Sequence, residues 1–440
     1  MKKTSIKFFL LAIICLGSFI LLGLNNDKNV TAKDKNLYKD IKTFGEVLDM
    51  VRKNYVDEVD TNKLMQGAIN GMIRSLDPHS SFMTPDLYKE LEVETQGQFG
   101  GVGIEIMIIK DVLTVVSPIE DTPAFHAGLK SGDQILKIDG KSTKDITIME
   151  AVRQLRGPKD TKVTVTIQRE KMTTPKDIIL TRAMIQVKSV KYKKAEDHIG
   201  YIRIAAFQER TADELRKALR EMDEKNNPMK GLIVDLRNDP GGLLTQAIEV
   251  SDIFLKSGVI VSTRGRAKAM ETKSMAKNDN LEISCPIVVL VNEGTASAAE
   301  IVAGALQDNG RALIVGAQTF GKASVQTVIP LEDGSALKLT TARYYTPNGR
   351  SIQAEGITPD IIVPFVKTSE DTEIGIDKEE RLREKDLKGH IKPTKEDGTK
   401  IDETKGKDVK DALPLEDDNQ LKTAMDILKS WNIMKKIKLN

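Results

Sequence analysis

Short runs of branched apolar residues, each followed by a glycine turn and a helix pattern, constrain the fold of this 440-residue chain most strongly. Residues 231–235 read GLIVD and lead into Asp239-Pro240-Gly241-Gly242. Residues 287–291 read IVVLV and lead into Asn292-Glu293-Gly294. Strands and helices alternate in this way up to Val315, which predicts an α/β core.

Ser297 stands at the start of the helix that follows the second apolar run. The sequence Ser297-Ala298-Ala299-Glu300 fits a capping box, in which the serine and the glutamate satisfy the first N–H groups of the helix. On local physics alone, a helix cap is the commoner role for such a serine. The two roles are compatible, because N–H groups at a helix N-terminus can also hold an oxyanion beside a nucleophile.

A nucleophilic serine needs a base, and histidine offers none within the expected core. The histidines of the chain are His79, His126, His198 and His390, and none lies between residues 199 and 389. Lysine can act as the base if burial and a helix N-terminus lower the pKa of its amine from about 10.4 to about 7–8. Lys322 follows the strand at 312–315 and is placed for this role. Gln326, four residues further on, can orient the amine through a hydrogen bond.

From residue 98 the pattern changes to short strands and glycine turns. A phosphate-binding loop is rejected at residues 99–106, because β-branched residues rather than a helix follow the glycines. Ala127-Gly128-Leu129, together with the motif at residues 132–140, resembles a PDZ domain over residues 98–182. In that family a glycine loop binds the terminal carboxylate of a peptide, which adds as a strand to the sheet edge. The resemblance places this loop at Gly101, Val102, Gly103 and Ile104. An ordinary tight turn is the other interpretation.

The N-terminal 32 residues have the layout of a secretory signal. Basic residues at positions 2, 3 and 7 precede an uncharged apolar stretch over residues 8–24. Cleavage after Ala32 would release the chain, and retention would leave residues 8–24 as a membrane anchor. Either way we expect an exported protein, periplasmic or otherwise extracytoplasmic, and either free or anchored to the inner membrane.

Residues 37–97 are predicted to form a helical region. Amphipathic helices are expected over residues 37–56 and 61–75, with packing or dimerisation as their role. Asp77-Pro78-His79-Ser80 ends the second helix.

Residues 367–440 form the last region. Lys, Asp and Glu crowd residues 368–411, so we expect a loosely ordered segment there. A final amphipathic helix over residues 418–434 is expected to dock on the body or on a second copy. Its apolar face carries Leu421, Met425, Leu428 and Trp431.

Several motifs resemble those of the carboxyl-terminal processing proteases, the tail-specific serine peptidases of S41 type. They are Asp235-Leu236-Arg237-Asn238-x-x-Gly241-Gly242, Gly294-Thr295-Ala296-Ser297-Ala298, Thr319-Phe320-Gly321-Lys322-x-x-x-Gln326-Thr327, Ala342-Arg343-Tyr344-Tyr345-Thr346-Pro347 and Gly356-Ile357-x-Pro359-Asp360. The order of parts over residues 37–366 agrees as well. Departures are small: Asp239-Pro240 fills a position often given to Asn or Gly, and Asp160 stands where the PDZ turn often has Gly.

The resemblance implies both a fold and a set of site residues. The fold is α+β and multidomain: a crotonase-like α/β protease core over residues 189–366, an inserted PDZ domain, and helical N- and C-terminal regions. The resemblance implies Ser297 as the nucleophile, Lys322 as the general base and Gln326 as the residue that orients the base. It implies that the N–H groups of Gly242 and Ala298 bind the oxyanion.

The leading hypothesis is therefore an exported serine endopeptidase that captures substrate C-termini through its PDZ domain. The alternative is a catalytically inactive PDZ adaptor on a degenerate protease fold, against which the intact serine, lysine and glutamine argue. An acyl-CoA enzyme of the same fold is disfavoured by the export signal and the PDZ domain. Arg156 is a candidate for coupling the PDZ domain to the site, and a solvated turn arginine is its other interpretation.

Composition narrows the partners. The 66 basic and 64 acidic residues nearly cancel and aromatics make up only 4%, so nucleic acid is not expected. Cys15 lies in the N-terminal segment, and Cys285 alone offers no disulfide or metal framework. No cofactor is expected. The expected partners are protein or peptide substrates with apolar C-termini, a second copy bound through the terminal helices, and an adaptor protein.

Overall fold

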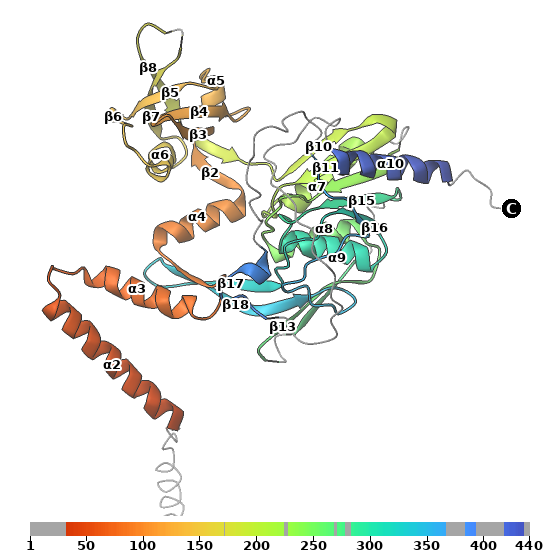
Figure 1. Cartoon of the computed structure of the whole chain (residues 1–440). Helices are drawn as coiled ribbons and strands as arrows, with labels where there is room; N and C mark the ends of the chain where they lie inside the picture. The colour runs from red at the N-terminus through yellow and green to blue at the C-terminus, as the bar shows by residue number, and fades with distance from the viewer. Residues whose placement is uncertain are drawn as a thin grey trace, which may run out of the picture. The chain divides into compact units, whose positions relative to one another are not determined.

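The computed structural model describes residues 32–170, 172–223, 228–267, 271–277, 283–366, 383–392 and 418–434. The chain divides into two compact units, Met1–Met72 and Ile73–Asn440. The first unit holds α2 (Ala32–Asn54) and most of α3 (Thr61–Arg74), close to the two predicted helices (Figure 1). The candidate signal or anchor at residues 8–24 lies outside the described residues. Among the helices that are described, none is long and apolar enough to cross a membrane.

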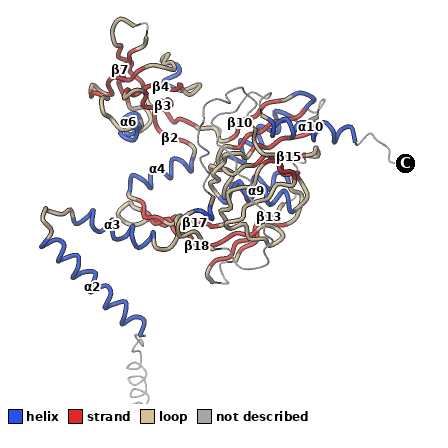
Figure 2. Tube along the Cα trace, viewed as in Figure 1, coloured by secondary structure: helices blue, strands red, loops and turns tan. Residues whose placement is uncertain are grey.

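The second unit contains a six-stranded sheet, to which the strands β10 and β15 in Figure 2 belong. Its strand order is β10–β11–β12–β15–β16–β19, and every neighbouring pair is parallel except β10 with β11. The strands are β10 (Val190–Lys194), β11 (Ile199–Ile204), β12 (Gly231–Asp235), β15 (Ile287–Val291), β16 (Ala312–Gly316) and β19 (Ile361–Ile362). All residues of β12 and β15 are buried, which confirms the prediction from the two apolar runs.

Helices cover both faces of this sheet. One face packs against α7 (Thr211–Met222), α8 (Leu244–Phe254) and α9 (Ala298–Asp308). The other packs against α10 (Asn419–Met434) (Figure 1). Leu421, Met425 and Leu428 of this helix belong to a buried apolar cluster with residues of the strands. Docking of the last helix on the body is thus confirmed. The prediction that Trp431 shares the packed face is wrong: its side chain is 47% exposed, because the buried stripe ends at Leu428.

A second sheet carries distant parts of the chain. It contains β1 (Ser81–Met83), β18 (Ala336–Tyr345), β13 (Val259–Gly265) and β14 (Thr272–Met275), in that order, and β17 (Ser324–Pro330) pairs with β18. The register brings Ser81 opposite Lys338. The loop before β1 is therefore held on the same sheet as the strand that follows Lys322.

The segment that resembles a PDZ domain has its own sheet and core. Its strands are β3 (Ile104–Ile109), β4 (Val112–Pro118), β5 (Gln134–Ile138), β6 (Lys141–Ser142), β7 (Lys162–Gln168) and β8 (Lys176–Thr181), and its helices are α5 (Pro123–His126) and α6 (Ile148–Leu155). The helix α4 (Pro85–Gln96) leads to β2 (Gln98–Gly101), which pairs with β9 (Ala183–Gln186). Asp160 adopts a φ of 68°, a conformation that aspartate tolerates better than most residues, so the departure from Gly there is accommodated.

The charged segment that follows the core in sequence, residues 368–411, is ordered at one place where its composition predicted a loose structure. Residues 383–392 are described and include a 3₁₀ turn, η3 (Glu384–Asp386). The side chain of Glu384 is completely buried. The expectation of a loosely ordered stretch is wrong for these residues, because Glu384 has buried hydrogen-bond partners. The rest of residues 368–411 lies outside the described part.

Candidate active site

Ser297 lies in the turn between β15 and α9, with an unusual backbone. Its φ is 55° and its ψ is −114°. Positive φ is uncommon for a residue with a Cβ, and such conformations persist where the surroundings hold them, often at functional sites. Its N–H donates to Oε2 of Glu300 at 2.9 Å, which is the glutamate contact that the capping pattern predicted.

The turn after β12 packs directly on Ser297. A Cβ on Gly241 would lie 2.8 Å from the carbonyl oxygen of Ala296, from the nitrogen of Ala298 and from Cβ of Ser297, so only glycine fits there. Gly242 comes next, with a φ of 141°. Within the described ranges, the N–H groups of Gly242 and Ala298 donate to no acceptor of the chain.

Lys322 precedes β17 and its amine is largely buried. Burial lowers the pKa of the amine, and the positive charge of Lys338 lowers it further. The carboxylates of Glu384, Glu300 and Asp77 act in the opposite direction without outweighing burial. The net shift is toward the neutral amine, which is the form that a base requires.

Glu300 ties Ser297 and Lys322 together. Its carboxylate is completely buried, and Oε2 accepts hydrogen bonds from the N–H groups of Ser297 and Lys322, each at 2.9 Å. Oε1 accepts from the N–H of Gly321 at 2.8 Å and from the hydroxyl of Thr319. Burial raises the pKa of Glu300 to about 7, although these hydrogen bonds act to lower it. One side chain therefore fixes the main chain of both candidate catalytic residues.

Tyr344 contacts the main-chain carbonyl groups of Ser297 and Lys322. Its hydroxyl lies 3.0 Å from the carbonyl oxygen of Ser297 and also contacts that of Lys322. Burial, with the nearby charges of Glu300 and Glu384, raises the pKa of Tyr344 well above its ordinary value. The hydroxyl therefore remains a neutral donor.

Gln326 lies on β17, near the same cluster. Its amide nitrogen donates to Oγ of Ser324 at 2.9 Å and to Oγ1 of Thr340 at 3.3 Å. In the part of the chain that the structure describes, no hydrogen bond joins Gln326 to the amine of Lys322. Its orienting role therefore stays a prediction.

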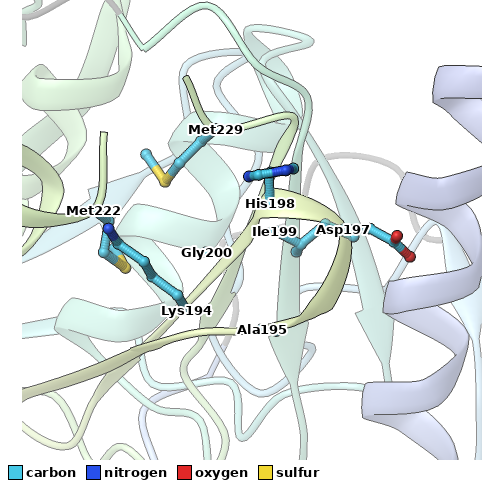
Figure 3. A pocket seen from close by; sticks show the side chains of 8 residues that line it. All are labelled: Lys194, Ala195, Asp197, His198, Ile199, Gly200, Met222 and Met229. Carbon is cyan, nitrogen blue, oxygen red and sulfur yellow. The ribbon is translucent and has the colours of Figure 1, made fainter. Parts of the chain in front are cut away.

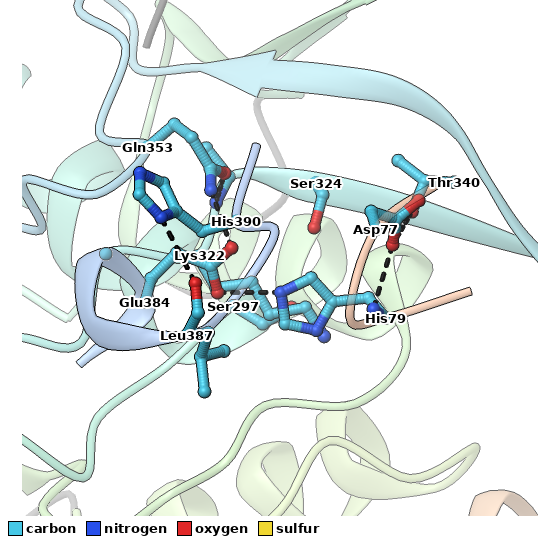
Figure 4. A network of polar contacts seen from close by, with 12 residues as sticks. Asp77, His79, Ser297, Lys322, Ser324, Thr340, Gln353, Glu384, Leu387 and His390 are labelled. Carbon is cyan, nitrogen blue, oxygen red and sulfur yellow. Dashed lines mark hydrogen bonds and ion pairs between the residues drawn. The ribbon is translucent and has the colours of Figure 1, made fainter. Parts of the chain in front are cut away.

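Sequence reasoning missed the loop before β1 as part of this site. Oδ1 of Asp77 accepts the N–H groups of His79 and Ser80, each at 2.8 Å, and contacts Oγ1 of Thr340 at 3.2 Å. Burial acts to raise the pKa of Asp77, but these hydrogen bonds and that of the Ser80 hydroxyl outweigh it, and the pKa lies below its ordinary value. Nε2 of His79 lies 2.7 Å from Oε2 of Glu384, in the network that also contains Lys322 and Ser297 (Figure 4). The available signal was Asp-Pro-His-Ser itself, which was interpreted only as the end of a helix.

Buried charged residues flank the turn after β12 that carries Gly241 and Gly242. Arg237 donates to Asp235 at 2.7 Å and, at 2.8 Å, to Asp418, the residue directly before the last helix. Asp239 accepts the N–H of Gly241 at 2.8 Å through Oδ1, whereas its Oδ2 is buried without a hydrogen-bond partner. Burial raises the pKa of Asp239 well above its ordinary value.

The candidate peptide loop of the PDZ-like unit, residues 101–104, joins β2 to β3. Gly103 has a φ of 77°, and a Cβ there would lie within 2.5 Å of the side chain of Thr122. The carbonyl oxygen of Val102 accepts the N–H of Ala124 at 2.9 Å. Arg156 is half-buried and stacks on the ring of Phe99, with its guanidinium carbon 4.6 Å from the ring centre. A fully solvated turn arginine is thus not what the structure shows.

A separate pocket of about 200 Å³ lies at the start of β11 (Figure 3). Its lining includes Lys194, His198, Met222 and Met229, and none of the predicted site residues takes part.

Family models match three parts of the chain. Residues 198–363 match peptidase family S41, residues 114–169 match a PDZ domain, and residues 22–86 match the model described as the activating protease CtpB N-terminal domain. The carboxy-terminal-processing protease of Bartonella bacilliformis is 47% identical over 393 residues, 88% of each chain.

The chain belongs to peptidase family S41. The carboxy-terminal processing protease CtpA of Bacillus subtilis, 35% identical, also aligns over 82% of this chain and 77% of its own length. Among solved structures, the photosystem II D1 C-terminal processing protease is 30% identical, with a TM-score of 0.43 and coverage of 73% of this chain and 92% of that one.

This S41 chain is a serine protease with a PDZ domain. The expected α+β multidomain organisation is confirmed in its main parts: an α/β protease core, a PDZ domain and a helical N-terminal region.

Proposed function

We propose that this S41 protease is an exported endopeptidase that cleaves peptide bonds with Ser297 as nucleophile and Lys322 as general base. The observation that carries the proposal is the buried Glu300 carboxylate, which holds the backbones of both residues within hydrogen-bond distance of one oxygen. The lowered pKa of Lys322, caused first by burial, supports its role as a base.

The chemistry follows from these positions. The neutral amine of Lys322 takes the proton of the Ser297 hydroxyl as its oxygen attacks the substrate carbonyl carbon. The N–H groups of Ala298 and Gly242 stabilise the oxyanion that forms. Lys322 then gives the proton to the leaving amine as the peptide C–N bond breaks. Water cleaves the acyl-enzyme by the same route in reverse, and Gln326 is proposed to orient the amine.

The substrates of this protease are proposed to be proteins or peptides with apolar C-termini. The loop Gly101–Ile104 would hold the terminal carboxylate, and the peptide would extend along a sheet edge. The positive φ of Gly103 supports a loop whose backbone can approach a ligand closely. Several relatives are named for carboxy-terminal processing, and we extend that activity to this chain. Export is proposed from the basic and apolar pattern of residues 1–32.

Arg156 is proposed to couple the PDZ domain to the protease core. Its stacking on Phe99, which belongs to the β2–β9 ribbon, supports this role. In Arg156→Ala we expect slower cleavage of a protein with an apolar tail and unchanged cleavage of a short peptide. Equal effects on both substrates would contradict coupling.

The test of the function uses the full chain and an unstructured protein with an apolar C-terminal tail. Ser297→Ala and Lys322→Ala should each abolish cleavage, followed by mass spectrometry of the products, while thermal unfolding stays close to wild type. Lys273→Ala, which changes an exposed lysine on β14, is the control. Full activity in either site variant would overturn the proposal. Tail binding by the wild type without any cleavage would instead favour the inactive adaptor.

A further inference from the structure

We propose that Glu384, from the charged segment behind the core, is a positioning residue of the protease: together with His79 it anchors Gln353, which holds the main chain beside Lys322. This inference rests on the proposed role of Lys322 as the base. It assigns a function in the active site to two residues outside the S41 match at residues 198–363, His79 before it and Glu384 after it.

Glu384 is held at both carboxylate oxygens. Oε1 accepts a hydrogen bond from Nε2 of Gln353 at 2.8 Å, and Oε2 lies 2.7 Å from Nε2 of His79 (Figure 4). The side chain of Glu384 is completely buried, and that of His79 is 13% exposed. A buried carboxylate is unfavourable unless its oxygens are satisfied, so the loop before β1 and the segment 383–392 stabilise each other's position.

Gln353 transmits this anchor to the catalytic turn. Its side chain is completely buried, and its Oε1 accepts the N–H of Ala323, directly after Lys322, at 2.9 Å. An amide has one oxygen and one NH₂ group, so the bond to Ala323 requires the NH₂ group to face Glu384. The main chain around Lys322 is thus bound directly by the Glu300 carboxylate and, through Gln353, by the Glu384 carboxylate.

The backbone of the segment follows the same turn. The N–H of Glu384 donates to the carbonyl oxygen of Phe320 at 3.4 Å, and the N–H of Phe320 donates to Thr295 at 3.0 Å. The 3₁₀ turn η3 is thereby attached to residues 320–323, the short stretch that contains Lys322.

Burial lowers the pKa of Lys322, and the negative charge of Glu384 acts in the opposite direction. A residue that only supported the fold would not change the pH profile of cleavage, so this effect distinguishes the two roles. The charged groups that face the amine are Lys338 on β18, Glu300 on α9, Asp77 before β1 and Glu384 on η3. His79 lies against Glu384 from the loop before β1. Removing the negative charge of Glu384 while keeping its shape should favour the neutral amine.

The experiment compares full-length variants by steady-state cleavage of a tailed protein across a pH series, with thermal unfolding of each. Glu384→Gln keeps an acceptor for Gln353, so we expect its kcat at alkaline pH to be within a few-fold of wild type. The acidic limb of its pH–kcat profile, where kcat rises with pH, should lie at lower pH than in wild type. Glu384→Ala leaves Gln353 without its acceptor, so kcat should fall by about ten- to a hundred-fold with KM little changed, as expected for a misplaced catalytic group. Glu332→Gln, on the exposed β17–β18 turn, should match wild type.

Two results would overturn the inference. One is a wild-type kcat in Glu384→Ala together with an unmoved acidic limb in Glu384→Gln. The other is a higher kcat in Glu384→Ala, which would mean that the segment restrains the site. If Glu384→Ala fails to fold, the pH profile of Glu384→Gln decides. Ser297→Ala and Lys322→Ala in the same assay separate the two proposals. If both are inactive while the Glu384 variants behave as wild type, only the positioning role of Glu384 is rejected. If either is active, the Ser–Lys mechanism is rejected.

Discussion

Ser297 and Lys322 are held by their main chains rather than by their reactive atoms. Glu300 accepts hydrogen bonds from their N–H groups, and the Tyr344 hydroxyl contacts their carbonyl oxygens. Both anchoring side chains are buried, so water competes little for these hydrogen bonds. This arrangement holds the main chains of the proposed nucleophile and the proposed base close together and leaves the Ser297 hydroxyl and the Lys322 amine out of these hydrogen bonds.

Replacing Glu300 by Gln should damage both activity and stability. One amide oxygen cannot accept the hydrogen bonds that two carboxylate oxygens accept, and the new NH₂ group would face N–H donors. We expect kcat/KM to fall by about a hundred-fold, as for a catalytic group displaced by about 1 Å. Each buried donor left unsatisfied should cost roughly 1–3 kcal/mol of unfolding free energy.

Cleavage rates and urea unfolding of Glu300→Gln measure the two effects. Glu249→Gln, an exposed carboxylate on α8, is the matched control. Wild-type activity in Glu300→Gln would show that the tie between Ser297 and Lys322 is dispensable.

The pH dependence of cleavage should report the state of Lys322. The base must be neutral, so kcat/KM rises as the pH passes upward through the pKa of Lys322, which burial holds below its ordinary value. Lys338 lowers this pKa further by repulsion, so Lys338→Met should raise it and move the acidic limb to higher pH. Lys273→Met serves as the exposed control. A limb that moves to lower pH in Lys338→Met would refute the assignment of the base.

Asp239→Asn should stabilise the protein near neutral pH. Burial raises the pKa of Asp239 well above its ordinary value, so the unfolded chain releases this proton at a lower pH than the folded chain does. Stability therefore falls as the pH rises from about 4, the unfolded pKa, toward the folded pKa. Asparagine stays neutral and keeps an acceptor for the N–H of Gly241.

The gain in Asp239→Asn is measured as the Tm difference from wild type at pH 5 and pH 8. It should be larger at pH 8, with about 2–4 °C for each kcal/mol gained. An equal or smaller gain at pH 8 than at pH 5 would contradict the raised pKa.

Among the elements, α10 joins the core through both an apolar stripe and a buried ion pair. Leu421, Met425 and Leu428 pack on the sheet, and Asp418 at the helix start binds Arg237. Arg237 follows β12 and leads into the turn that carries Gly241 and Gly242. The last helix thus supports the proposed oxyanion turn through one arginine.

Asp418→Ala should weaken this attachment. It leaves the Arg237 guanidinium buried beside Asp235 with fewer acceptors, and breaking a buried pair costs about 3–5 kcal/mol. Urea unfolding measures the loss, and limited proteolysis of the last helix locates it. Asp426→Ala, an exposed position on the same helix, should remain near wild type. Equal stability of the two variants would mean that the apolar stripe alone holds α10.

At the scale of the whole molecule, the site is assembled from segments that lie far apart in the chain. His79 and Glu384 are separated by 305 residues, and β1 pairs with β18 although more than half of the chain lies between them. The PDZ domain lies within this interval and is bounded by the β2–β9 ribbon. An inserted domain of this kind leaves the core sheet intact, because its two connections run side by side.

Local patterns in the sequence were sufficient for the main helices and strands, and they drew attention to Ser297 and Lys322, whose catalytic roles stay proposals. Runs such as IVVLV at β15 and the cap pattern at Ser297 depend on spacing within a few residues, and the predicted run at residues 287–291 coincides with β15. The histidine count pointed to Lys322, and its burial agrees with that hypothesis. The tertiary structure alone decided which carboxylates act on Lys322. Glu300 lay in the predicted cap, but its bonds to Gly321 and Lys322, and the contact of Glu384 with His79, follow from folding across tens to hundreds of residues, which no local spacing encodes.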